Sequence, residues 1–249
     1  MRKTIIGILA FLPLLLWAFP TDEATLLSAY MEGNMSVWKA YVDSSDWAQL
    51  SSDEKVRYIN YEYGYVATLI DVAPAGQKTK KKGVSPTAAY VARFGEHIEE
   101  AKSILAPSRY CLYRSAYFAY DYMLSKSLNS AIKSFQLCKQ AVQEDDHDPL
   151  ALSLMANVDF YAPRIVGGNK EKALDLYLQA KQILLSNDAL YLTLWNNPAT
   201  RLCIVQCYDK LGQIEKAIDE AQSILERYPN FVYLRDEYLP ELQNKKTGH

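Results

Sequence analysis

Apolar residues recur at steps of three and four along most of the chain, and the stretch Gly212–Asn230 shows this pattern most clearly. Its apolar positions form one stripe of an α-helix: Ile214, Ala217, Ile218, Ala221, Ile224, Leu225 and Tyr228. Gly212 accepts the left-handed conformation that ends the preceding helix, and Pro229 stops this one. The stretch is therefore predicted to be half of a helical hairpin.

The same periodicity predicts helices along the rest of the chain, and no alternating strand pattern is visible in the sequence. Helix starts are marked by a capping box at Ser51–Glu54, by Ser85 before Pro86 and by Asp148 before Pro149. The predicted helices run over about 22–44, 52–71, 86–105, 107–126, 129–143, 148–161, 169–185, 197–211, 213–229 and 233–243. We therefore expect an all-α fold, an α-α superhelix of stacked antiparallel helical hairpins.

A small residue recurs at equivalent places in three of these segments. Ala131, Ala173 and Ala217 are spaced 42 and 44 residues apart, and each follows a helix of similar length. A period of this size is typical of hairpins that bury their apolar faces against their neighbours.

The stretch CYDKLGQIEKAIDEAQSILERYPN resembles one tetratricopeptide repeat, a helix–turn–helix unit. The matching positions are Tyr208, Gly212, Ala217 and Pro229, and a second, similar unit has Gly168, Ala173, Tyr177 and Ala180. The best repeats lie within residues 108–230. The resemblance implies a concave helical groove that binds a protein or peptide.

The stretch GGNKEKA from Gly167 to Ala173 also resembles the exported helical T components of TRAP-type solute transporters. This second resemblance implies a different function, that of a solute-binding accessory subunit of a transport system. It predicts an enclosed pocket lined by tyrosines in place of an open groove.

The N-terminus has the layout of a secretory signal peptide, because Arg2 and Lys3 precede an apolar run from Ile5 to Phe19. The run is shorter than the roughly 20 residues that span a bilayer. We therefore expect residues 1–18 to be removed on export and residues 19–249 to form the helical repeat domain. The mature protein is predicted to be periplasmic or secreted, with no stable membrane span.

Composition narrows the classes of partner. Apolar residues make up 49% of the chain, which favours a folded protein, and the net charge of −2 argues against nucleic acid as a partner. The four cysteines are predicted to be small buried core residues: Cys111, Cys138, Cys203 and Cys207. The three histidines are far apart in the sequence, so we expect no metal site, and no cofactor is predicted.

Two sets of residues are candidates for binding a partner. In the first set, Tyr110, Arg114, Tyr117 and Asp121 share one face of a tyrosine-rich helix, where Arg114 is placed to pair with Asp121 or to stack on a tyrosine. The structural alternative, which we favour, is that these tyrosines pack between helices.

The second set lies on the first helix of the next hairpin and just beyond it: Asn157, Tyr161 and Arg164. Trp195, in a later insert, is expected to be buried, and it would anchor a partner if it were exposed. The lysines between 78 and 82 are interpreted as a solvated loop, with contact to anionic head groups as the alternative.

Common enzyme signatures are missing from the sequence: G-x-S-x-G, H-E-x-x-H, the phosphate loop and the dinucleotide fingerprint. The sequence therefore predicts that the protein is not an enzyme. The leading interpretation is a non-catalytic exported scaffold that binds a protein or peptide in its groove. The alternative is the solute-binding accessory subunit of a transport system.

Overall fold

The computed structural model of the chain describes residues 22–71, 86–162, 164–186 and 194–247, and every regular element in these ranges is helical. The elements are α1 (Glu23–Met31), α2 (Met35–Ser44), η1 (Trp47–Gln49), α3 (Ser52–Asp71), α4 (Pro86–Glu100), α5 (Pro107–Ser125), α6 (Leu128–Glu144), α7 (Pro149–Tyr161), η2 (Arg164–Val166), α8 (Lys170–Ser186), α10 (Asn196–Lys210), α11 (Ile214–Arg227), η3 (Leu234–Tyr238) and α12 (Leu239–Thr247). The prediction of an all-α fold is confirmed.

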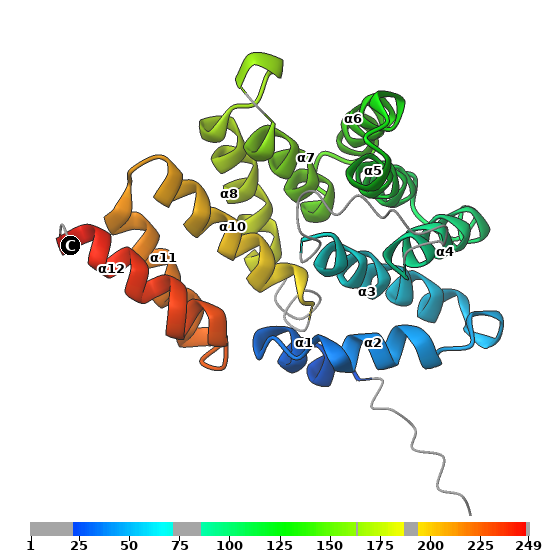
Figure 1. Cartoon of the computed structure of the whole chain (residues 1–249), viewed down its shortest axis with the longest axis horizontal. Coiled ribbons are helices and arrows are strands. Elements are labelled where there is room, and N and C mark those ends of the chain that lie inside the picture. Colours follow the sequence, from blue (N-terminus) through cyan, green and yellow to red (C-terminus); the bar gives the residue numbers. More distant parts are fainter. Residues whose placement is uncertain (1–21, 72–85, 163, 187–193, 248–249) are drawn as a thin grey trace, which may run out of the picture.

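Consecutive helices pack as hairpins, and the hairpins follow one another in a curved row (Figure 1). The most extensive contacts are within the pairs α5–α6, α7–α8 and α10–α11. The first helix of each hairpin also contacts the first helix of the next one: α3 contacts α5, α5 contacts α7, and α7 contacts α10. The chain is therefore a helical repeat stack, as the periodic alanines predict.

Local sequence signals begin and end several helices as expected. At the start of α3, the backbone N–H of Ser51 donates to Glu54 Oε2 at 2.8 Å and the N–H of Glu54 donates to Ser51 Oγ at 3.4 Å, which confirms the capping box. At the start of α7, Asp148 accepts from the N–H of Leu150 at 3.0 Å. Gly212 ends α10 with a φ of 72°.

The single helix predicted from Asp22 to about Ser44 is wrong, because the structure has two helices there. Gly33 adopts a φ of 70°, and the N–H of Asn34 bonds back to the carbonyl of Ala29 at 2.8 Å. Glycine takes this left-handed conformation without steric cost, so it ends α1 within an otherwise helical pattern.

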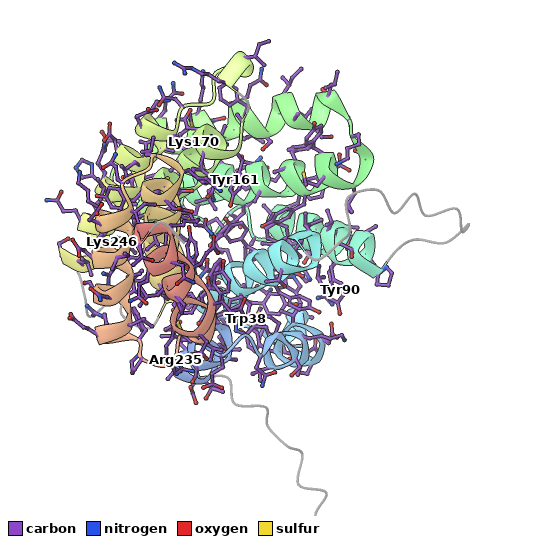
Figure 2. All side chains as sticks on the ribbon, turned by 60° about the vertical axis from the view of Figure 1, so that its left-hand side comes forward. Trp38, Tyr90, Tyr161, Lys170, Arg235 and Lys246 are labelled. Carbon is purple, nitrogen blue, oxygen red and sulfur yellow. The ribbon has the colours of Figure 1, made fainter. Side chains whose placement is uncertain are left out.

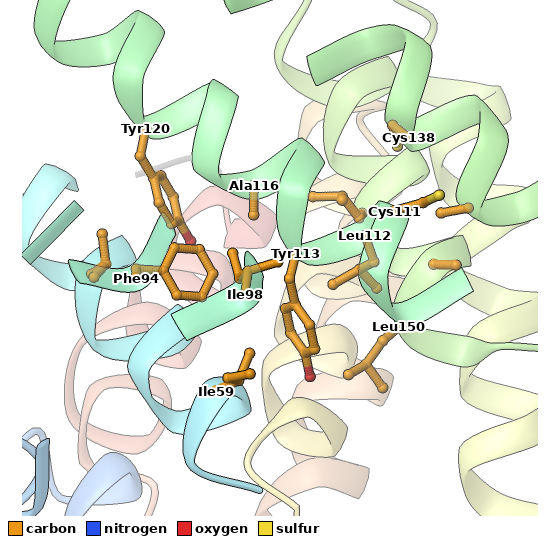
Figure 3. Close-up of a cluster of buried hydrophobic side chains, with 14 of the residues drawn as sticks. Ile59, Phe94, Ile98, Cys111, Leu112, Tyr113, Ala116, Tyr120, Cys138 and Leu150 are labelled. Atoms are coloured by element: carbon orange, nitrogen blue, oxygen red, sulfur yellow. The ribbon is translucent and has the colours of Figure 1, made fainter. Parts of the chain in front are cut away.

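The largest apolar cluster lies between α3, α4, α5, α6 and α7. Figure 3 shows Tyr113 of α5 pointing between Ile59 of α3 and Leu150 of α7. Cys111 and Cys138 are buried in the same cluster, and Cys207 is buried in another between α7, α8 and α10. The cysteines are thus mostly buried core residues, as predicted, with Cys203 partly exposed.

The first helix packs against the last hairpin, so the curved row returns on itself (Figure 1). Met31 is buried with apolar residues of α11 and η3, and the rings of Tyr30 and Phe231 have centroids 5.9 Å apart. Figure 2 shows Trp38 in the interior, between the first two helices and α3. Aromatic side chains therefore fill the centre of the curve.

The predicted signal peptide and the lysine run at 78–82 lie outside the described residues. In the part of the chain that is described, no helix combines the length and the apolar character needed to cross a membrane.

Candidate ligand-binding cavity

A partly open cavity of about 230 Å³ lies where α1, α3, α7, α8 and α10 meet. Helical periodicity brings its lining together, because residues at steps of one, three and four share a face. The lining residues from the three main helices are Tyr63, Gly64, Ala67 and Thr68 of α3, Leu150, Ser153 and Asn157 of α7, and Asn196, Ala199, Thr200 and Cys203 of α10. Tyr30, Tyr177 and Trp195 complete the wall.

Aromatic rings form one side of the cavity. The ring of Trp195 lies 5.4 Å from that of Trp38, 5.6 Å from that of Tyr30 and 5.8 Å from that of Tyr63, measured between centroids. These spacings are those of tilted and edge-to-face aromatic pairs, which add to the stability that burial alone provides. Trp195 is therefore held from several sides, and the expectation that it is buried is confirmed by its 8% exposure.

Gly64 allows this aromatic packing. A Cβ atom at this position would lie 2.6 Å from Cζ3 of Trp38 and 2.7 Å from Cζ2 of Trp195. Both distances are shorter than any ordinary carbon contact. Because glycine has no side chain, both indoles can lie directly against the backbone of α3 at the base of the cavity.

Polar groups are few and mostly paired with one another. The hydroxyls of Ser153 and Thr200 are 3.0 Å apart, and Ser153 also donates to the carbonyl of Pro149 at 2.7 Å. The phenol of Tyr177 donates to Oδ1 of Asn157. Within the described residues, the indole N–H of Trp195 is buried and has no hydrogen-bond partner.

Among the described residues that line the cavity, none has a charged side chain. Burial raises the pKa of the phenols of Tyr30 and Tyr63, and it raises the pKa of the Cys203 thiol to about 11. All of these groups are consequently neutral at physiological pH. An ionised solute would lose its hydration in this cavity without gaining a counter-charge.

Of the candidate residues from the sequence, Asn157 and Trp195 line this cavity together. Tyr161 is 69% exposed at the end of α7, with its ring 4.9 Å from that of Phe160. Arg164 is exposed in η2 and borders a separate hollow of about 200 Å³ with Gly168 and Lys170. The structure therefore places the second candidate set in two different locations.

The α5 candidates are engaged mainly with α4. Arg114 Nε lies 2.9 Å from Glu99 Oε1, and Tyr110 donates to the same carboxylate at 3.1 Å. Arg114 also lies over the ring of Tyr117, 5.0 Å from its centroid, so the expected stacking is present. Asp121 accepts from Ser130 of α6 in place of Arg114. These contacts join neighbouring helices, which is the structural alternative that the sequence favoured.

The sequence analysis did not predict most of the residues that line the cavity. Tyr30 and Tyr63 are tyrosines among many, and Gly64 lies within a helical pattern where it has no local reason to be glycine. A usable signal was the small polar residues at helical spacing on the first helices of hairpins: Ser153 and Asn157 of α7, and Thr200 and Cys203 of α10. They mark helix faces that are neither fully apolar nor charged.

No protein-family model matches this chain, and no curated protein matches it. Among solved structures, the chain is similar to the HusA haemophore from Porphyromonas gingivalis, with 15% sequence identity and a TM-score of 0.49. The match covers 76% of this chain and 94% of that one. Because the sequence identity and the TM-score are this low, we infer the function of this chain from its own cavity and not from this similarity.

Proposed function

We propose that this chain is a non-catalytic binding protein that holds a small, uncharged, ring-bearing solute in the cavity beside Trp195. The observation that carries the proposal is the hollow itself, whose wall combines the aromatic rings of Tyr30, Tyr63 and Trp195 with uncharged polar side chains.

The size of the cavity limits the solute. Its volume of about 230 Å³ is below the roughly 300–1,000 Å³ of sites for drug-sized ligands. A molecule of one or two rings fits this volume. Rings are favoured because Tyr30, Tyr63 and Trp195 present aromatic surface to the solute.

The chemistry of the wall selects a neutral solute. Its polar groups are the Asn157 amide, hydroxyls and the Cys203 thiol, none of which is charged at neutral pH. A solute with one acceptor and few other polar atoms matches these groups. Ionised carboxylates and amines do not.

The geometry supports this role over binding of a peptide in a groove. The inner faces of α3, α7 and α10 surround a small hollow, and Trp38 and Trp195 fill the centre of the curve. An extended peptide needs a long open surface. A small, partly open hollow lined by tyrosines is closer to the pocket expected of a solute-binding subunit than to a peptide groove.

The proposal also includes that the protein is exported and that it works with a transport system. The motivating observation is the charged-then-apolar N-terminus of the sequence, which is typical of secretory signal peptides. In this role the protein would capture its solute outside the cytoplasm and release it to a transporter. The proposed role requires no cofactor and no catalytic group.

Calorimetry and tryptophan fluorescence test the proposal with three probes, indole, phenol and benzoate. Indole and phenol should bind saturably and change the fluorescence, whereas ionised benzoate should bind at least tenfold more weakly because it finds no counter-charge. Ala199→Leu, which fills the cavity from α10, should abolish the binding of both neutral probes.

The control is Ile165→Ser, because Ile165 is 93% exposed and is not part of the cavity lining. This variant should bind as the unaltered chain does. The proposal fails if neither neutral probe binds saturably, or if Ala199→Leu folds normally and still binds them with unchanged affinity.

A further inference from the structure

An apolar patch remains exposed at the turn between α5 and α6 and along α6. Its five residues, which we call the α6 patch, are Met123, Leu124, Leu128, Ile132 and Phe135. Leu128 is 74% exposed and Ile132 is 56% exposed. Leu128, Ile132 and Phe135 follow steps of four and three, so they form one stripe on the outer face of α6. The opposite face of α6 packs on α5 and α7, and α6 lies at the outer edge of the row (Figure 1).

Three lysines of α6 and of the α5–α6 turn lie over aromatic rings, one of them a ring of the patch. Lys139 lies over the ring of Phe135, with Nζ 4.4 Å from its centroid, and Lys133 lies over the ring of Phe118 at 5.1 Å. Lys126 caps α5 and lies 5.6 Å from the ring of Tyr122. Their ammonium groups are thus held beside aromatic surface on the same two helices as the patch.

Acidic residues are absent from most of this helix. Between Leu128 and Gln143, α6 contains no aspartate or glutamate, and its one acidic residue is Glu144 at the last position. At a rise of about 1.5 Å per residue, Glu144 lies roughly 24 Å along the helix from Leu128. The α6 part of the patch is therefore apolar and cationic, and the acidic residue nearest in sequence to its α5 part is Asp121, which accepts a hydrogen bond from Ser130 of α6.

We propose that the α6 patch is a docking surface for a membrane that contains anionic lipids. Helices that lie in the membrane interface have apolar side chains flanked by lysine or arginine, which is the composition of this face. The charge pattern disfavours a second copy of the chain as the occupant, since the lysines would face lysines in a symmetric contact. This inference is independent of the cavity and its solute.

Co-sedimentation of the full-length chain with vesicles tests the proposal. One set is phosphatidylcholine alone, and the other is equal parts of phosphatidylcholine and phosphatidylglycerol. The chain should bind the anionic vesicles more tightly, and added salt should weaken the binding. Replacing Lys126, Lys133 and Lys139 by glutamine should reduce the affinity about fivefold per lysine on the anionic vesicles only.

A second variant removes apolar surface, with Ile132→Ser and Phe135→Ser together, and should weaken binding at least tenfold. The matched control is Ile165→Ser, because Ile165 is 93% exposed on another hairpin. All variants keep the same N-terminus, so differences between them report on the α6 patch. Because the altered side chains are exposed, helical circular dichroism should be unchanged, which confirms that the variants fold.

Two results would overturn the proposal. The first is binding to anionic vesicles that the lysine variant and the apolar variant leave at the level of the control. The second is light scattering that shows self-association of the unaltered chain and its loss in the apolar variant, which would assign the patch to a second copy.

Discussion

The side-chain amide of Asn230 donates a hydrogen bond to the hydroxyl of Ser28 at 3.1 Å, although the two residues are 202 positions apart. Together with the packing of Tyr30 on Phe231, this bond joins the first helix to the last hairpin. Tyr30 also lines the cavity. The junction that closes the row of hairpins and the wall of the binding site therefore share a residue, so changes at the junction should reach the site.

Phe231→Ala tests this coupling. Phe231 is 3% exposed and packs in the cluster that contains Met31. Its removal should lower the free energy of unfolding by about 3–5 kcal/mol, measured by urea denaturation. The affinity for indole should also fall, because Tyr30 loses the ring that supports it.

The control at the same junction is Asn230→Ala, which removes a partly exposed hydrogen bond and should cost about 1 kcal/mol. If Phe231→Ala destabilises the fold and leaves the affinity for indole at the value of the unaltered chain, the junction and the cavity are not coupled.

Gly64→Ala should damage both the core and the site. The added methyl group would overlap the indoles of Trp38 and Trp195, so one of them must move. Overpacking of this kind costs about 1–3 kcal/mol, and displacement of Trp195 toward the hollow should reduce the affinity for indole at least tenfold. Urea denaturation and calorimetry measure the two effects.

Gly212→Ala is the matched control. Gly212 has a φ of 72°, and a Cβ atom added there would meet nothing within 4 Å, so alanine is strained by conformation alone, at about 1 kcal/mol. Its affinity for indole should be unchanged. Equal affinities of the Gly64→Ala and Gly212→Ala variants for indole would show that Gly64 does not shape the cavity.

Helix positions could be predicted from the sequence because their signals are local. The Ser51–Glu54 box, the Asp148 cap and Gly212 each act within a few residues, and each is found as expected. Gly33 was missed because the periodic apolar pattern continues across it. Whether a glycine continues a helix or ends it depends on the packing of both flanking segments, which a local pattern does not contain.

The cavity could be predicted only in part because it is built from contacts that are distant in the sequence. Asn60 bonds to Asn196 across 136 positions, and Tyr30 meets Trp195 only when the row of hairpins curves back. Asn157 was found because it lines up with Tyr161 on the first helix of a hairpin, and Trp195 because it is a large aromatic residue in an irregular insert. The tyrosines of α5 were equally unusual, yet their contacts lead to α4 and not to the cavity.

Arg93→Met should be strongly destabilising because of Glu62. The Glu62 side chain is fully buried, and it accepts from Arg93 Nε at 3.0 Å and contacts His97 Nδ1 at 2.8 Å. Without Arg93, the buried carboxylate of Glu62 loses the guanidinium group that pairs with it. We expect the free energy of unfolding, measured by urea denaturation, to fall by about 2–4 kcal/mol. Breaking a fully buried ion pair costs about 3–5 kcal/mol, and the expected loss is smaller here because the Arg93 side chain is 32% exposed.

The double variant Arg93→Met with Glu62→Gln should recover part of this loss, since the buried group is then neutral. For comparison, Lys246→Met breaks an ion pair in which both partners are exposed, and it should cost less than about 1 kcal/mol. A double variant that is less stable than Arg93→Met would show that the buried carboxylate is not the source of the cost.

Alkylation of Cys203 by N-methylmaleimide should report on both the pKa and the cavity. The thiolate is the reactive form, and burial raises the pKa of this thiol from 9.0 to about 11. The rate should therefore still rise about tenfold from pH 9 to pH 10, where an ordinary thiol is already levelling off. Because Cys203 lines the cavity, saturating indole should slow its alkylation, as measured by peptide mass spectrometry. Cys207 is the internal control, since it lies outside the lining, and equal protection of both thiols would indicate general stabilisation and not occupation of the site.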